Sequence, residues 1–170
     1  MKVFLNRLSH TMSKGFTVIE LLVVVLIMGV LLGIVGFQMK TWLGKARVEG
    51  EIQQMYADLT NARIRATNRN RSHFVVMSLN QYQIWEDTNP APDGNGTLET
   101  AGGDTLVQQT SLRDSLLSAA TYPLFTCGSK GFMSNLSTIQ IQNDYGAMYD
   151  CIEISQTRIR LGRWQGGVCS

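Results

Sequence analysis

The amino-acid sequence predicts an α+β fold, in which one long N-terminal hydrophobic helix packs on an antiparallel β-sheet domain. Three observations lead to this prediction. From Phe16 to Phe37 the only charged residue is Glu20. Beyond Phe37, apolar residues recur at helical steps as far as Asn68, and after Asn70 the spacing changes to that of strands. A helix followed by a series of strands is the element order of an α+β domain.

Residues 16–37 are predicted to form a transmembrane and assembly helix. At about 1.5 Å per residue this helix is roughly 33 Å long, which is enough to cross a bilayer. Glu20 is the anomaly, because an ionised acid in hydrocarbon costs roughly 2.5 to 3.5 kcal/mol. If the chain is cut after Gly15, the new α-amino group of Phe16 lies one turn from Glu20 and supplies a positive charge, in the same chain or in a neighbour. Glu20 is then an assembly contact.

Residues 1–15 are predicted to be a cleaved leader peptide. They contain three basic residues and no acidic residue, and positive charge beside a span stays in the cytoplasm. The rest of the chain is then expected to face the periplasm or the exterior. Removing the leader leaves twelve of the fifteen basic residues against thirteen acidic ones, so DNA binding would require a local patch. An ordinary signal anchor is the alternative; a cleaved secretory signal fits worse, because no small-x-small pattern follows the apolar run.

Residues 38–69 are predicted to continue the helix in amphipathic form, with one face on a sheet. The apolar positions at three- and four-residue steps are Ile52, Met55, Tyr56, Leu59, Ala62 and Ala66.

Residues 70–170 are predicted to form a β-rich globular domain. Thr88 to Asp104 is rich in Pro and Gly and is expected to be a surface loop. A short helix near Leu112 to Ala120 is weakly indicated. The segments rich in β-forming residues are Ser72 to Leu79, Gln81 to Glu86, Thr105 to Ser111, Tyr122 to Cys127, Ser137 to Gln142, Cys151 to Ser155 and Arg158 to Trp164.

The three cysteines, Cys127, Cys151 and Cys169, lie in the part expected to be exported, where disulfides persist. An odd number predicts one bridge and one free thiol, with three pairings open. No metal site is expected, because His73 is the only histidine after the leader and the sequence has no C-x-x-C.

The stretch Lys14-Gly15-Phe16-Thr17-Val18-Ile19-Glu20-Leu21-Leu22 resembles the N-terminal signature of type IV pilins and type II secretion pseudopilins. The resemblance implies that prepilin peptidase cuts between Gly15 and Phe16, that Phe16 is then methylated, and that Glu20 acts in assembly. Many members carry a proline where this chain has Phe37. Glycines such as Gly29 and Gly33 would then loosen the helix in a fibre, or instead serve close helix contact.

Two C-terminal segments resemble the GspH/FimT family of minor pilins and pseudopilins. They are Phe125 to Asn143 and Cys151 to Arg160. In the DNA-uptake branch, a Gly-Arg-x-Arg motif near the C-terminus is associated with DNA binding. Here Thr157 replaces the glycine before Arg158 and Arg160, whereas Gly162 and Arg163 lack the second arginine.

The arginines of this C-terminal segment have a physical interpretation of their own. Arg158 and Arg160 share one face of a strand, where they can grip phosphates, and Trp164 is expected further along that face to stack on a base. The alternative is that Ile159 and Leu161 fill the core while the arginines only cover the solvent face. A second basic cluster, Arg63, Arg65, Arg69 and Arg71, complements the dipole at the helix end or forms a stripe with Arg158.

No catalytic residue or cofactor is expected, because the sequence has no nucleophile motif, phosphate loop or readable pair of acids. The predicted function is that of a minor pilin or pseudopilin, a structural or priming subunit of a type IV pilus or type II secretion pseudopilus. The alternative is a DNA-binding minor pilin for natural transformation. The expected partners are other pilins, prepilin peptidase, the bacterial inner membrane and, in the alternative, DNA.

Overall fold

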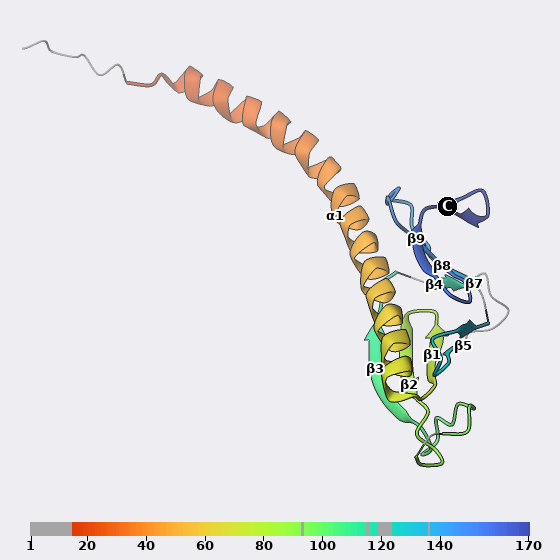
Figure 1. Ribbon diagram of the computed structural model, residues 1–170. Helices are drawn as coiled ribbons and strands as arrows, with labels where there is room; N and C mark the ends of the chain where they lie inside the picture. The colour runs from red at the N-terminus through yellow and green to blue at the C-terminus, as the bar shows by residue number, and fades with distance from the viewer. Residues whose placement is uncertain (1–14, 93, 115, 119–123, 136) are drawn as a thin grey trace, which may run out of the picture. The chain divides into compact units, whose positions relative to one another are not determined.

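The computed structural model describes residues 15–92, 94–114, 116–118, 124–135 and 137–170 (Figure 1). The predicted leader lies outside the described residues except for Gly15. The chain separates into two compact units, Met1–Lys40 and Thr41–Ser170.

Helix α1 runs from Val18 to Arg69, so it begins in the first unit and ends in the second. It starts two residues after the expected position, Phe16. In the first unit, the large apolar side chains between Val18 and Leu32 are all exposed, which means that no described residue of the chain covers them. Within the described ranges, no helix is both long enough and apolar enough to cross a membrane.

In the second unit, one face of α1 is buried, and Figure 1 shows this part of the helix lying along β1, β2 and β3. The helical spacing predicted this face correctly, since five of the six expected positions are buried and Tyr56 packs partly buried against them. The buried helical residues are Val48, Ile52, Met55, Leu59, Ala62 and Ala66.

Within the described ranges, the strands form two antiparallel sheets and a small hairpin. The first sheet has the order β3-β2-β1-β5-β6, the second has the order β4-β7-β8-β9, and β10 pairs with β11. The strand bounds are β1 His73–Ser78, β2 Gln81–Glu86, β3 Thr105–Ser111, β4 Leu116–Ser118, β5 Leu124–Cys127, β6 Met133–Ser134, β7 Ser137–Ile141, β8 Cys151–Ile154, β9 Ile159–Gly162, β10 Trp164–Gln165 and β11 Val168–Cys169. A long helix on antiparallel sheets confirms the predicted α+β class.

In the described part of the segment from Leu112 to Ala120, which leaves out residues 115, 119 and 120, the expected short helix is not formed. The backbone there forms β4, which pairs with β7, because Leu117 lies opposite Gln140 at the edge of the second sheet. The single strand expected from Arg158 to Trp164 is also divided. Arg163 lies between β9 and β10, where its backbone exchanges two hydrogen bonds with Ser170 instead of continuing the ladder.

One core joins the helix to both sheets. It takes Val75, Tyr82 and Phe125 from the first sheet and Ile139 and Ile152 from the second. Beside this core lies a buried acid of α1. Asp58 is buried, and its Oδ2 accepts hydrogen bonds from Tyr82 Oη at 2.6 Å and Gln108 Nε2 at 2.7 Å. These partners satisfy the carboxylate inside the protein.

Candidate functional site

The N-terminal motif lies at the start of α1. Gly15, Phe16 and Thr17 precede the helix and are exposed, so the peptide bond between Gly15 and Phe16 lies in accessible, non-helical chain. Thr17 is the N-cap residue: its Oγ1 accepts a hydrogen bond from the Glu20 amide at 3.3 Å, and its carbonyl oxygen accepts one from Leu21. The cap explains why the helix begins at Val18 rather than Phe16.

Glu20 occupies the first turn of the helix, where a negative charge complements the helix dipole. Thr17 and Glu20 also have the Thr-x-x-Glu spacing of a capping box. The sequence carries this signal, although the prediction of Glu20 as an assembly contact does not use it. A test of the assembly role must therefore separate the charge of Glu20 from its effect on the helix end.

The C-terminal arginines lie around β9. Ile159 is buried and Leu161 packs partly buried against the core, whereas Arg158 and Arg160 are exposed. Arg160 Nε lies 3.5 Å from Glu153 Oε2 on the neighbouring strand β8, where the two residues are register partners. This arrangement agrees with the core-filling interpretation of the isoleucine and leucine. Because Arg160 is paired with a carboxylate, Arg158 is the less neutralised of the two arginines.

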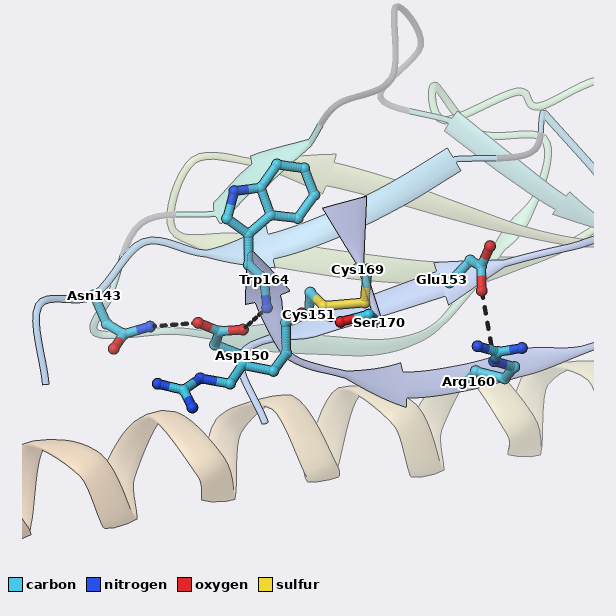
Figure 2. The surroundings of a disulfide bond; sticks show 9 residues. Asn143, Asp150, Cys151, Glu153, Arg160, Trp164, Cys169 and Ser170 are labelled. Atoms are coloured by element: carbon cyan, nitrogen blue, oxygen red, sulfur yellow. Dashed lines mark hydrogen bonds and ion pairs between the residues drawn. A yellow bond between two sulfur atoms is a disulfide. The ribbon is translucent and has the colours of Figure 1, made fainter. Parts of the chain in front are cut away.

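Trp164 does not continue the face of Arg160. The Trp164 amide donates to Asp150 Oδ1 at 2.6 Å, which anchors the start of β10 away from the β9 ladder. In the view of Figure 2, the indole ring and the Arg160 guanidinium lie on different sides of the disulfide. The expected platform of one aromatic beside two arginines is therefore not formed.

The structure explains the residues at the two positions compared with the glycine of the Gly-Arg-x-Arg motif, Thr157 and Gly162. Among the described residues, the non-glycine residues with positive φ are Asn70 and Asn135, so Thr157 occupies a backbone conformation that does not require glycine. Gly162 is buried, and a Cβ there would lie 2.8 Å from Cys169 Sγ and 2.9 Å from the Ser170 carbonyl oxygen. Its missing side chain makes room for the C-terminus.

The second basic cluster is largely engaged within the protein. Arg63 donates from Nε to the Gly131 carbonyl at 2.8 Å and from Nη1 to the Thr157 carbonyl at 2.7 Å. Arg69 and Arg71 pair with the buried Glu86 at 2.6 and 3.4 Å. Arg63 therefore brings the cluster beside the residue before Arg158. No sequence signal could have found this contact, because its partners are 68 and 94 residues away.

Cys151 and Cys169 form a disulfide, and Cys127 is free and buried (Figure 2 draws the disulfide). Burial raises the pKa of the Cys127 thiol to about 11, and nearby Arg63 opposes this shift only in part. A thiol with this pKa is a weak nucleophile at neutral pH. In the described part of the chain, no group of three or more His, Cys, Asp or Glu side chains is arranged to hold a metal ion.

Residues 11–36 match a protein-family model, the prokaryotic N-terminal methylation motif. The match includes the cleavage and methylation residues proposed from the sequence, Gly15 and Phe16, and also Glu20. It supports a type IV pilin-like class, associated with a pilus or the membrane, and suggests a structural rather than an enzymatic protein. Comparison with curated proteins and with solved structures finds no match.

Proposed function

We propose that this chain is a minor pilin or pseudopilin subunit that is cut after Gly15, methylated on Phe16 and built into a helical fibre through the first half of α1. The methylation motif at residues 11–36 is the observation that carries the proposal. The exposed apolar side chains from Val18 to Leu32 support it, because such a surface is stable only when lipid or other protein covers it.

The first half of α1 is proposed to lie in the bacterial inner membrane before assembly, with the second unit in the periplasm. This part rests on the sequence of residues 16–37 and on the basic leader. The minor role, of the GspH/FimT type, rests on the resemblance of the segments around β5 to β9. Mass spectrometry of the chain from the native host tests processing: we expect a chain that begins with methylated Phe16, and an intact leader would refute it.

The role of Glu20 is tested with two substitutions that separate its charge from its capping position. Glu20→Gln removes the charge but keeps a side chain that suits the third helical position of a capping box. Glu20→Ala removes both. If the carboxylate meets a neighbouring α-amino group, both variants should enter the membrane normally and both should fail to enter fibres, as measured by the subunit content of sheared fibres.

Two outcomes of this experiment would contradict the proposed role of Glu20 in assembly. Normal incorporation of Glu20→Gln together with loss in Glu20→Ala would assign Glu20 to the helix end alone. Normal incorporation of both would remove it from assembly. Thr17→Ala is the control for the cap, because it weakens the hydrogen bond to the Glu20 amide but retains the carboxylate.

DNA binding is the second candidate function, and the exposure of Arg158 favours it. Arg63 carries its guanidinium to the carbonyl of the preceding residue, Thr157, and the exposed Lys130 precedes the other carbonyl that Arg63 binds. These three cations support a small basic surface. Against it stands Glu153, which pairs with Arg160. We therefore expect weak binding that falls steeply with salt.

A gel shift with the full mature chain in mild detergent tests the hypothesis that the chain binds DNA. The variant Arg158→Ala/Arg160→Ala should lose binding, while Arg47→Ala/Arg113→Ala should retain it, since both pairs remove the same charge from exposed positions. Equal losses in the two variants would indicate net charge rather than a site. No shift at low salt would leave the structural function alone.

A further inference from the structure

The loop of residues 87–104, called the β2–β3 loop below, carries the only Asn-Gly pair of the sequence, Asn95 and Gly96. Figure 1 shows this loop beyond the ends of β2 and β3. Asn-Gly pairs are prone to deamidation, because glycine has no side chain to hinder its amide nitrogen. That nitrogen attacks the asparagine Cγ, its proton leaves by way of water with the departing ammonia, and water opens the succinimide to aspartate or isoaspartate.

The nitrogen that would attack is held by a buried carboxylate. The Gly96 amide donates to Asp87 Oδ2 at 2.7 Å, and the Asn95 amide donates to Asp87 Oδ1 at 3.1 Å. Asp87 is only 1% exposed. Removing the proton from the Gly96 nitrogen would place an amide anion beside this carboxylate, and a neighbouring like charge opposes such an ionisation. The closed loop therefore slows the first step of the reaction.

The carboxamide that would be attacked is held at both of its polar atoms. Asn95 Oδ1 accepts hydrogen bonds from the Thr97 amide at 2.8 Å and the Thr97 hydroxyl at 2.6 Å, and Asn95 Nδ2 donates to Glu99 Oε1 at 2.9 Å. The succinimide ring is nearly planar, so ring closure takes the side chain out of the staggered rotamers. This rotation breaks the hydrogen bonds to Thr97 and Glu99, so the closed loop opposes ring closure as well.

Glu99 is itself fixed within the loop. Its Oε2 accepts a hydrogen bond from Asn89 Nδ2, and its amide donates to Asp104 Oδ2 at 2.8 Å. Asp104 Oδ1 accepts a hydrogen bond from the Thr88 amide at 3.0 Å, which ties the start of the loop to its end. Asn95 is nevertheless exposed, so the water that the reaction consumes is at hand when the loop opens.

We propose that Asn95 and Gly96 form a deamidation site whose rate is set by opening of the β2–β3 loop. Asp87 and Glu99 keep the reaction slow while the loop is closed. Once Asn95 has become aspartate, a carboxylate replaces the amide group that faced Glu99, and repulsion between the two acids holds the loop open. Isoaspartate also adds a methylene to the backbone, which moves the Gly96 amide away from Asp87. The loop therefore changes in one direction only as the protein ages.

The dependence on loop opening is tested with the full mature chain in mild detergent at neutral pH. Peptide mapping by mass spectrometry measures the conversion of Asn95 in the native protein and in the same protein unfolded in guanidinium chloride. Because only the opened loop reacts, we expect the native rate to be at least about tenfold lower. Equal rates would overturn the proposal. Isomerisation of Asp93, which also precedes a glycine, does not interfere, because it releases no ammonia and leaves the mass unchanged.

The role of the Asp87 charge is tested with Asp87→Asn, which keeps an acceptor oxygen but removes the negative charge beside the Gly96 nitrogen. Once CD shows that this variant folds, Asn95 should be converted at least about threefold faster than in the unmodified sequence. Asp144→Asn is the matched control, because it removes the same charge from an exposed loop between β7 and β8 and should leave the rate unchanged. Equal rates in the two variants would overturn the protective role of Asp87.

The consequence of the reaction is tested with Asn95→Asp, which carries the product side chain. Exchange of the Gly96 amide hydrogen, followed by NMR, should become at least about fivefold faster, because repulsion from Glu99 opens the loop. In Asn95→Asp/Glu99→Gln the donor and the acceptor are interchanged, so slow exchange should return. Unchanged exchange in Asn95→Asp would overturn the one-way opening. Equally fast exchange in both variants would overturn the repulsion between residues 95 and 99 as its cause.

Discussion

His73 is a buried histidine with one hydrogen-bonded nitrogen. Its Nδ1 lies 3.3 Å from the Arg71 carbonyl oxygen and therefore carries the proton, whereas the buried Nε2 has no hydrogen-bond partner among the residues that the structure describes. Burial lowers the pKa of His73 below 6.5, and Arg65 and Arg69 act in the same direction; the Arg71 hydrogen bond and the charge of Glu86 oppose the shift. Protonation would place a second N–H group where the described part of the chain offers it no acceptor.

The free energy of unfolding should consequently fall in acid. Because the folded pKa is depressed, the unfolded state binds the proton first, and the stability that neutral His73 provides is present above pH 6.5 and is lost as pH falls from there through the folded pKa. The slope is at most about 1.4 kcal/mol per pH unit. Denaturant unfolding at pH 7.5 and pH 5 measures it, with His73→Asn as the control that keeps a donor for Arg71. Equal slopes for the two proteins would contradict this account.

Individual residues divide into those that the sequence identifies and those that only the fold identifies. Glu20 could be identified because a lone acid in an apolar run is a local anomaly. The Cys151–Cys169 pairing could not, because three pairings were compatible with the chain and the choice depends on which strands meet. The acceptor role of Asp58 could not be identified either, because it depends on Tyr82 and Gln108, which come from separate strands.

At the scale of elements, the spacing of apolar residues predicted the long helix and the longer strands, and it failed for the strands of two or three residues. Helix α1 and strands β1, β2 and β3 contain enough residues for the helical or alternating spacing to repeat, and they lie within two residues of the expected bounds. Strands β6, β10 and β11 have two residues each and β4 has three, which is too few to show a period. Their pairing is set by partners distant in sequence, as for β4 on β7.

The C-terminal disulfide and Gly162 form one packed element. Gly162 lies opposite Cys151 in the register of β8 and β9, and Cys169 Sγ occupies the space that a side chain would need. Gly162→Ala should lower the free energy of unfolding by about 1 to 3 kcal/mol, the usual cost of overpacking. Urea unfolding under oxidising conditions measures this loss.

Gly50→Ala is the control for this element, since it lies in α1 and a Cβ there meets nothing within 4 Å. It should stabilise the helix by roughly 1 kcal/mol. In a Cys151→Ala/Cys169→Ala background the cost of Gly162→Ala should shrink, because the sulfur contact is gone. An unchanged cost would place the clash on the Ser170 carbonyl rather than on the disulfide.

At the scale of the whole second unit, polar contacts connect regions that the sequence separates. The Met133 amide of β6 donates to the Gln156 carbonyl in the turn before β9 at 2.9 Å, which joins the first sheet to the second. Arg63 makes the corresponding contact from the helix, through Gly131 near β6 and Thr157 near β9. These contacts arise only when the two sheets pack on α1, so no local sequence pattern predicts them.

Replacing Arg63 should therefore loosen the two sheets together. Two hydrogen bonds from a partly buried charged group to carbonyl oxygens are together worth about 2 kcal/mol after an allowance for solvent exposure. Arg63→Ala should lower the free energy of unfolding by this amount and speed hydrogen exchange in the turns at residues 128–131 and 155–158. Arg65→Ala is the matched control, because it removes the same charge from an exposed position on the same helix and should change stability by less than about 0.5 kcal/mol. If the two variants were equally stable, or if exchange rose in only one turn, Arg63 would not be the link between the sheets.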